Sequence, residues 1–441
     1  MARTARETAL IVLAACRRDG AWSDGRLKAE IRENGLSRAD AALCTHICYG
    51  VMQNMSLLNF YLAHYCTMSL KKLEPQVLDI LRAGAYQIIY LDKVPDSAAV
   101  NEAVKAAKRL KNPRAAGLVN GVLRTISREK ERLPALNCAT KQEYLALKYS
   151  HPLWLVRRLY DIYGRQDCEK LLAADNEPAP TTVQVNTLRC GEDEAVRSLE
   201  EQGVAVEKHP FLPGCLILKN TGDMEKLRAF AQGLIQPQDA AARLAVLAAA
   251  PKPGMRIVDG CSAPGGKSFA SAMLMEDRGD IRAFDIHEHK IALIEKGARR
   301  LGITIIRGEQ NDARNVKDEL RDWADIVIAD VPCSGMGTIR KKPDVRFKKE
   351  RDVDAMPPLQ LQILTALSKY AKPGGTVLYS TCTILPEENE KVVEKFLKEN
   401  SNFSLESFTL PGVGETAGYV TLLPHIHGTD GFFICRLRRN T

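Results

Sequence analysis

Apolar residues recur at intervals of three and four positions through roughly the first 130 residues. The stretches ARETALIVLAACRRD, EPQVLDILRAGAYQIIYL and DSAAVNEAVKAAKRL show this spacing. A period near 3.6 residues places apolar side chains on one face of a helix, and that face must pack against other helices. The pattern therefore predicts an all-α N-terminal domain over residues 1–138.

The pattern changes after the segment NEPAP at residues 176–180. Short apolar runs, TTVQVNTL and CLIL, lie on either side of the charged helical stretch GEDEAVRSLEEQG. Runs of this length, bounded by turn residues, are typical of strands. We expect a small α/β subdomain here, preceded by a linker helix in SHPLWLVRRLYDIYG, the two together covering residues 139–237.

From residue 238 to the end, short apolar strands alternate with amphipathic helices. The strands are MRIVD, IRAFD, ITIIRG, ADIVIAD, TVLYST and GFFICRLR. Such alternation predicts a parallel α/β sheet, here a Rossmann-like domain over residues 238–441. The last strands, together with GYVTLLP, could form an antiparallel edge.

Composition narrows the class of protein only slightly. Hydrophobic residues make up 45% of the chain and charged residues 26%, as in ordinary soluble proteins. The basic and apolar start passes into the helical pattern, so we interpret it as a first helix and not as a signal peptide. The twelve cysteines lack the paired CxxC spacing of zinc sites. We expect a cytoplasmic monomer without metal or membrane contact, and the net charge of +8 favours a polyanionic partner.

A glycine-rich turn follows the first strand of the C-terminal domain in MRIVDGCSAPGGKS. Gly265 and Gly266 allow the backbone to approach a ligand that a side chain would block. The spacing matches neither GxGxxG nor GxxxxGK[ST], which disfavours a dinucleotide or a nucleoside triphosphate. The turn is instead suited to a ligand without phosphate groups.

Carboxylates stand at or just after four successive strands, at Asp259, Asp285, Asp312 and Asp330. Asp285 lies 19 residues after Gly266, near the interval at which an acidic residue meets ribose hydroxyls in such folds. Each aspartate alone could be a helix cap. Together, at the edge where open parallel sheets bind ligands, they indicate a nucleoside site, and S-adenosylmethionine fits it.

Two cysteines follow later strands, Cys333 in DVPCSGMG and Cys382 in YSTCTILPEEN. If these strands are neighbours, the two thiols converge beside the cofactor. A thiolate that adds to carbon 6 of cytosine activates carbon 5 for methylation, and Asp330 is placed to hold N3 and the amine. A second thiol could assist the later elimination. The alternative is that both thiols are structural, as we expect for Cys261 in the glycine-rich turn and for Cys16, Cys44 and Cys48 on helices.

The segments DGCSAPGGKS, DVPCSGMGTIRKKPDVR and YSTCTILPEEN resemble the signature motifs of RNA cytosine-C5 methyltransferases. The resemblance extends from about residue 151 to the end and implies a methyltransferase sheet of class I, dependent on S-adenosylmethionine. It implies that Cys382 is the nucleophile, that Cys333 promotes product release and that Lys267 belongs to the target pocket. The cofactor contacts it implies are Cys261, Ser262, Ala263, Pro264, Gly265, Gly266, Lys267, Asp285, Asp312 and Asp330.

The helical N-terminal part resembles the NusB family in LRAGAYQIIYLDKVPDSAAVNEAVKAAKRL and AAGLVNGVLR. A NusB-like domain, a small RRM-like subdomain and this methyltransferase domain in one chain resemble the RsmB (Sun or Fmu) type, which modifies a cytosine of 16S ribosomal RNA. One position departs from the pattern. Gln184 stands in TTVQVN where the family has arginine, which puts a backbone contact to RNA there in doubt.

A basic run, IRKKPDVRFKKER, follows Cys333. We expect Arg340, Lys341, Lys342 and Arg346 to hold RNA phosphates around a flipped target base, although such runs are also common on solvated faces. A second basic set, either for RNA or for protein docking, comprises Lys105, Lys108, Arg109, Lys111 and Arg114. Two other classes stay open: a non-catalytic RNA-binding or ribosome-assembly factor, and a methyltransferase for DNA or for an exocyclic amine.

Overall fold

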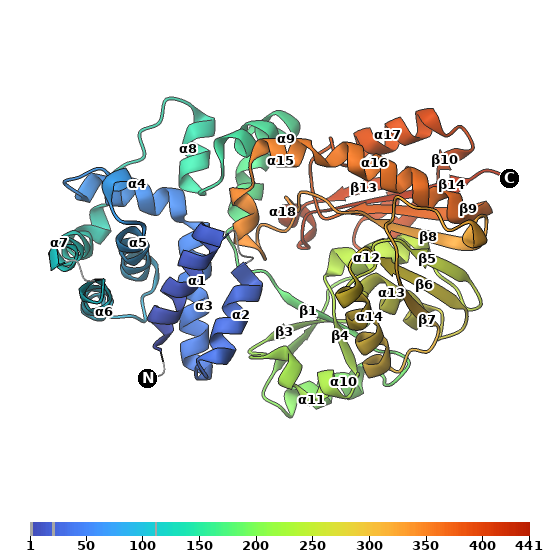
Figure 1. The fold of residues 1–441 in the computed structure, drawn as a ribbon, viewed down its shortest axis with the longest axis horizontal. Coiled ribbons are helices and arrows are strands. Elements are labelled where there is room, and N and C mark those ends of the chain that lie inside the picture. Colours follow the sequence, from blue (N-terminus) through green and yellow to red (C-terminus); the bar gives the residue numbers. More distant parts are fainter. Residues whose placement is uncertain (1–2, 20–22, 111–112) are drawn as a thin grey trace. The chain divides into compact units, whose positions relative to one another are not determined.

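The computed structural model describes residues 3–19, 23–110 and 113–441. Its contacts divide the chain into two compact units (Figure 1). The first unit comprises residues 1–177 and 339–348, and the second comprises 178–338 and 349–441. Across the described ranges, no helix combines the length and apolar character needed to span a membrane.

The first unit is helical, as the 3.6-residue periodicity predicted for residues 1–138. Residues 139–177, which the sequence grouped with the small α/β subdomain, and residues 339–348, which it grouped with the C-terminal domain, also belong to this unit because their contacts lie within it. Pro75 opens a helix at a position where its missing N–H costs nothing, and Ser37 caps another by accepting the N–H of Asp40. Apolar faces from these helices meet in one core that includes Ile47, Leu81 and Leu123. The elements are α1 (Ala5–Asp19), α2 (Ser23–Glu33), α3 (Arg38–Gln53), α4 (Met55–Tyr65), η1 (Leu70–Lys72), α5 (Pro75–Tyr90), α6 (Asp96–Lys108), α7 (Pro113–Glu129), η2 (Lys130–Arg132), α8 (Lys141–Lys148), α9 (Leu153–Ala174) and η5 (Pro343–Phe347), which packs against α3.

The small α/β subdomain predicted from the sequence lies at the start of the second unit. Its antiparallel sheet has the order β2-β3-β1-β4. Val183 and Leu216 point to the same small core as Leu199 of its helix. The elements are β1 (Thr181–Val185), α10 (Glu192–Glu200), β2 (Ala205–Lys208), β3 (Cys215–Lys219), η3 (Met224–Lys226), α11 (Arg228–Ala231) and β4 (Ile235–Pro237).

The rest of the second unit is built on a large sheet with the order β10-β14-β9-β8-β5-β6-β7, and β13 pairs with β14. The strands from β9 to β7 run parallel, whereas β14 is antiparallel to β9 and β13 is antiparallel to β14. This confirms the predicted parallel sheet with an antiparallel edge. The strands are β5 (Arg256–Asp259), β6 (Asp280–Asp285), β7 (Ile306–Gln310), β8 (Ala324–Asp330), β9 (Ala371–Thr381), β10 (Phe403–Leu405), β13 (Tyr419–Leu422) and β14 (Phe432–Arg439), with a separate pair β11 (Phe408–Leu410) and β12 (Gly414–Thr416).

Helices cover both faces of this sheet, with α12, α13 and α14 on one side and α16 and α17 on the other (Figure 1). Successive residues of a strand point to opposite faces. In β8, Ile326 and Ile328 join the first core, whereas Val327 and Ala329 join the second. The helices of this part are α12 (Ala240–Ala249), α13 (Gly266–Leu274), α14 (Glu288–Leu301), η4 (Asp318–Leu320), α15 (Glu350–Asp354), α16 (Met356–Leu367), η6 (Ser368–Tyr370), α17 (Glu390–Glu399) and α18 (Pro424–His427).

Because β5, β6, β7, β8 and β9 are parallel, their carboxyl ends lie along one edge of the sheet. The residues that follow these ends are therefore collected there, although they are far apart in the sequence. Asp330 of β8 pairs in register with Ser380 of β9. This pairing sets the position of the two segments that carry Cys333 and Cys382.

Candidate active site

The glycine-rich turn joins β5 to α13 and is held by a buried hydrogen-bond chain. Ser268 donates its hydroxyl to Asp259 Oδ2 at 2.7 Å, and the hydroxyls of Ser262 and Ser268 lie 2.9 Å apart. Gly265 has a φ of +104°, and a Cβ there would collide with the ring of Phe269. The turn therefore requires glycine at this position and presents its backbone at the sheet edge.

Asp259 is buried at the base of this turn. Burial raises the pKa of its carboxyl to about 6, an effect that the hydrogen bond from Ser268 opposes and the nearby charge of Asp330 reinforces. Its Oδ1 is buried without a hydrogen-bond partner among the described residues. A buried acceptor of this kind suits a cationic or N–H group of a ligand.

The carboxylates at the ends of β6 and β7 are anchored differently. Asp285 Oδ1 accepts the backbone N–H of His287 at 3.0 Å. Asp312, two residues beyond β7, accepts several N–H groups of Arg314, at 2.5–3.1 Å. These hydrogen bonds lower the pKa of Asp312. The predicted row of strand-end carboxylates is present, with Asp312 already paired to a cation.

Asp330 and Lys267 form an ion pair at the sheet edge. Lys267 Nζ lies 2.6 Å from Asp330 Oδ2, and Ser380 donates its hydroxyl to Oδ1 at 2.8 Å. Lys267 also lies 5.1 Å from the centre of the Phe432 ring. Burial alone would lower the pKa of Lys267, but the charges of Asp330 and Asp259 outweigh it and the net shift is upward. The ammonium thus stays protonated beside a partly exposed carboxylate.

Cys333 and Cys382 converge, as the sequence predicted for neighbouring strands. Their Sγ atoms are 3.0 Å apart, and the backbone N–H of Cys382 lies 3.3 Å from the Sγ of Cys333. Cys382 directly follows β9, and Cys333 lies three residues beyond Asp330. Both thiols are partly buried.

The surroundings of Cys333 favour its protonated form. Its hydrogen bond to Cys382 is the largest effect, burial is the second, and the charges of Cys382 and Glu388 add to them; all raise the pKa of Cys333. A Cys333 thiol that keeps its proton can donate it in a hydrogen bond to the sulfur of Cys382. This arrangement stabilises Cys382 as the thiolate of the pair.

The cysteines assigned a structural role are placed accordingly. Cys44 and Cys48 belong to the helical core of the first unit, and Cys16 packs against it. Burial raises the pKa of Cys261, which stands in the glycine-rich turn. A buried thiol with a raised pKa is a poor nucleophile, so Cys261 is not a candidate for the attacking group.

The basic run does not form one exposed surface. Lys342 is exposed and Lys341 partly so, whereas Arg340 and Arg346 are buried. Arg346 donates hydrogen bonds to the carbonyl oxygens of Gln53 (2.8 Å) and Ser150 (3.2 Å) and to Asn176 Oδ1 (2.9 Å). The expectation that Arg346 holds an RNA phosphate therefore fails, because its guanidinium is used inside the first unit.

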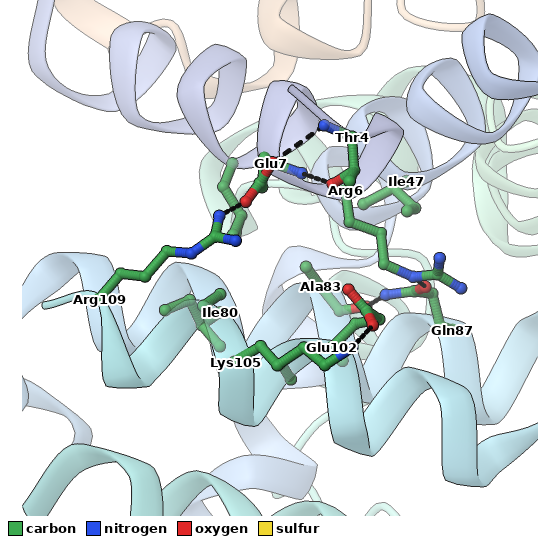
Figure 2. Close-up of a pocket in the computed structure, with 14 residues that line it drawn as sticks. Thr4, Arg6, Glu7, Ile47, Ile80, Ala83, Gln87, Glu102, Lys105 and Arg109 are labelled. Atoms are coloured by element: carbon green, nitrogen blue, oxygen red, sulfur yellow. Dashed lines mark hydrogen bonds and ion pairs between the residues drawn. The ribbon is translucent and has the colours of Figure 1, made fainter. Parts of the chain in front are cut away.

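Two members of the second basic set, Lys105 and Arg109, line a pocket of about 280 Å³ in the first unit, shown in Figure 2. Arg109 forms an ion pair with Glu7, and Lys105 with Glu102 at 2.7 Å (Figure 2). Lys111, also in this set, lies outside the described residues. Cations paired in this way add little net positive charge to the surface, so the pocket supports no assignment to RNA.

Three residues that touch the site were not predicted from the sequence. Ser380 holds Asp330, and Gln360 and Glu388 reach the loop that contains Cys333. A signal for Glu388 was available, because PEENE directly follows the second cysteine motif. Gln360, on α16, had none. Among the described residues, no group of three or more His, Cys, Asp or Glu could hold a metal ion.

Three family models match the chain. The model described as 16S rRNA methyltransferase RsmB/F matches residues 246–438. The NusB family model matches residues 3–128, and a ferredoxin-like domain model of RsmF/B-like methyltransferases matches residues 151–225. The matches fall on the three parts recognised from the sequence.

Similar proteins span nearly the whole chain. A probable ribosomal RNA small subunit methyltransferase B of Bacillus subtilis (strain 168) is 36% identical over 98% of both chains. A ribosomal RNA small subunit methyltransferase B of Klebsiella pneumoniae is 32% identical over 92% of both. Among solved structures, that of PH0851 is 27% identical, with a TM-score of 0.82 over 100% of both chains.

Proposed function

The chain belongs to the RsmB/F family of small-subunit ribosomal RNA methyltransferases, and we propose that it methylates carbon 5 of a cytosine in 16S ribosomal RNA. One observation carries the proposal: two thiols 3.0 Å apart at the same sheet edge as the Lys267–Asp330 pair. Methylation of an exocyclic amine needs no thiol, whereas a pyrimidine carbon needs a nucleophile to activate it. The paired thiols therefore favour carbon 5.

S-adenosylmethionine is the proposed methyl donor, and it supplies a methyl group on a positively charged sulfur. The residues present fit such a group. The glycine-rich turn from Cys261 to Gly266 presents its backbone at the sheet edge, and the buried Oδ1 of Asp259 is an acceptor without a hydrogen-bond partner among the described residues. Asp285 would hold the ribose hydroxyls and Asp312 the adenine amine.

The first step we assign is addition of the Cys382 thiolate to carbon 6 of the target cytosine. The new carbon–sulfur bond pushes electrons toward N3, which must gain a proton. Asp330 is placed to orient the ring and pass a proton to N3, and the Lys267 ammonium, whose Nζ lies 2.6 Å from Asp330 Oδ2, can supply that proton. Carbon 5 then becomes an enamine carbon and would take the methyl group, while the bond from that methyl group to the donor sulfur breaks and the donor leaves as a neutral thioether.

Elimination completes the cycle and gives Cys333 its role. Once Cys382 is bonded to carbon, the hydrogen bond and charge that raised the pKa of Cys333 are lost, so this thiol ionises more readily. The Cys333 thiolate takes the proton from carbon 5, the carbon–sulfur bond breaks, and Cys382 leaves as thiolate. N3 returns its proton to the Lys267–Asp330 pair, and one proton in total is released to solvent.

Replacing each thiol tests the assignment. We expect Cys382→Ala to lower the transfer of labelled methyl to 16S ribosomal RNA by at least about 10³-fold, because the nucleophile is lost. Cys333→Ala should accumulate a protein–RNA adduct that survives denaturation and is visible as a slower band on a denaturing gel. Cys190→Ala, in the small subdomain, is the control and should keep wild-type activity.

Two results would contradict the proposal. Methyl transfer retained in Cys382→Ala would indicate a target that needs no covalent intermediate. An adduct that forms without Cys382 but requires Cys333 would reverse the two roles.

A further inference from the structure

The two cysteines stand on segments without regular secondary structure. Cys333 lies between β8 and η5, and Cys382 between β9 and α17. Strand pairing fixes the position of Asp330 and Ser380 but ends before either thiol. Other contacts must therefore keep the two sulfur atoms 3.0 Å apart.

Glu388 makes one of these contacts from a fully buried position, with 0% of its surface exposed. Its Oε2 accepts the backbone N–H of Ser334 at 2.8 Å and the side-chain amide of Gln360, also at 2.8 Å. The same amide of Gln360 donates to the carbonyl oxygen of Pro332 at 3.0 Å. The two residues adjacent to Cys333 are thus both held, one by Glu388 and one by Gln360.

Glu388 is itself anchored to the strand that leads to the other thiol. The hydroxyl of Tyr379, on β9, donates to the carbonyl oxygen of Glu388 at 2.6 Å. The next residue, Asn389, accepts the hydroxyl of Thr381 at 2.6 Å and donates to the carbonyl oxygen of Thr383 at 3.1 Å. These bonds close the loop from Cys382 to Asn389 and fix where the Glu388 carboxylate lies.

Direct bonds also join the two cysteine segments. Ser334 donates its hydroxyl to Thr383 Oγ1 at 2.9 Å, and Gly337 donates its N–H to the carbonyl oxygen of Cys382 at 3.0 Å. A Cβ on Gly337 would lie 1.9 Å from the carbonyl oxygen of Gly431, so only glycine permits this approach. The carboxylate of Glu388 is the charged member of this buried network.

We propose that Glu388 is a positioning residue for methyl transfer, which holds Cys333 against Cys382 through Ser334. It touches neither the cofactor nor the base, and the inference rests on the proposed function of the two thiols. Both hydrogen bonds of the Glu388 side chain go to Oε2, while its buried Oε1 has no hydrogen-bond partner among the described residues. Hydrogen bonds to a charged acceptor are stronger than neutral ones. The network is therefore stiff and sets the separation of the sulfur atoms.

The same carboxylate acts on Cys333 electrostatically. Its negative charge contributes to the raised pKa of Cys333, together with the hydrogen bond to Cys382, burial and the charge of Cys382. Tyr379 also lies close enough to interact with Cys333. A thiol held in this way stays protonated until Cys382 has bonded to carbon.

The first experiment measures the thiols without RNA. Mild oxidation by hydrogen peroxide converts two adjacent thiols to a disulfide and water, and peptide mass mapping quantifies the Cys333–Cys382 bond. We expect Glu388→Ala to form it at least about 10-fold more slowly than wild type. Glu387→Gln is the matched control, because this neighbouring side chain is 38% exposed and pairs with Lys391. It should oxidise at the wild-type rate.

The second experiment measures catalysis. Glu388→Ala should lower kcat by about 100-fold, as expected for a displacement of about 1 Å, while KM for RNA and for the methyl donor changes little. Glu388→Gln keeps an oxygen that can accept both hydrogen bonds, so kcat should recover to within about 10-fold of wild type. Because the amide carries no charge, the kcat–pH profile of this variant should shift to lower pH.

Specific outcomes overturn the inference. Glu388→Ala with wild-type oxidation and kcat would show that the carboxylate does not position Cys333. If Glu388→Ala does not fold, Glu388→Gln still tests the inference. An unshifted pH profile of Glu388→Gln, with oxidation at the wild-type rate, would refute the electrostatic role. Loss of the disulfide in a folded Glu388→Gln protein would refute positioning through hydrogen bonds alone. Failure of the wild-type protein to methylate cytosine, with oxidation behaving as expected, would reject the proposed function but leave the positioning role intact.

Discussion

Lys267 and Arg346 both belong to the motifs that resemble the methyltransferase family, yet the protein uses their charges in opposite ways. Lys267 has 10% of its side chain exposed and one carboxylate partner, Asp330, which is 30% exposed. Arg346 is 1% exposed and surrounded by acceptors of the first unit, mainly backbone carbonyl oxygens. The first cation lies at the open edge of a sheet, and the second closes a packed interior.

This difference shows that the hydrogen-bond acceptors around a cation distinguish a functional cation from a structural one. Carbonyl oxygens at Gln53 and Ser150 need a donor whether or not a ligand is bound, and Arg346 supplies it. Burial lowers the pKa of Arg346 to about 10, which leaves it charged at neutral pH. Lys267 instead holds a proton beside a carboxylate that a substrate can reach.

The largest effect is expected when Lys267, the functional cation of the two, is replaced. Lys267→Met removes the proton shared with Asp330, and we expect methyl transfer to fall by about 10³-fold. Thermal unfolding should change little, because Asp330 is partly exposed and still accepts the hydroxyl of Ser380. Lys252→Met, at an exposed position, is the control. Activity within tenfold of wild type would remove Lys267 from the mechanism.

The next largest effect is expected on stability, when Arg346, the structural cation, is replaced. Arg346→Met leaves several buried acceptors without a donor, and we expect a loss of about 3 kcal/mol in the free energy of unfolding, measured with urea. Arg346→Lys should lose less, since one ammonium replaces part of the guanidinium fork. Arg351→Met, with 77% of the side chain exposed, should be neutral. Unchanged stability of Arg346→Met together with a tenfold higher KM for RNA would indicate that Arg346 contacts RNA.

The smallest effect is expected on RNA affinity, when Lys342, an exposed cation of the same basic run, is replaced. Lys342 is exposed four residues before the buried Arg346. If it contacts a phosphate, Lys342→Ala should raise the Kd for RNA a few-fold and reduce the slope of log affinity against log salt by about one. Lys219→Ala, exposed on β3 and paired with Glu207, should leave the slope unchanged. An unchanged slope for Lys342→Ala would show that Lys342 does not contact an RNA phosphate.

Much of the fold was predictable, because local patterns set it. The strands MRIVD, IRAFD and ADIVIAD appear as β5, β6 and β8 to within one residue. Periodicity decides whether a segment is a helix or a strand, and parallel strands bring their carboxyl ends to one edge. The glycine-rich turn and the strand-end carboxylates could therefore be assigned to one site from the sequence.

The convergence of Cys333 and Cys382 was predictable only under a condition, namely that their strands are neighbours. The order of strands in a sheet depends on long-range pairing, here between segments about 50 residues apart. No local pattern around Gln360 reveals that its amide reaches Glu388 and Pro332. Such contacts depend on how α16 packs against the sheet.

By itself, the sequence determined which segments are helical or extended, where glycine is required and which groups can carry out the chemistry. Only the tertiary structure decided which charges face inward. Arg346 looks like its basic neighbours along the chain, but its acceptors come from residues 53, 150 and 176, far away in sequence. A side chain's direction is set by the partners that folding brings to it, and those partners are not encoded in its immediate neighbourhood.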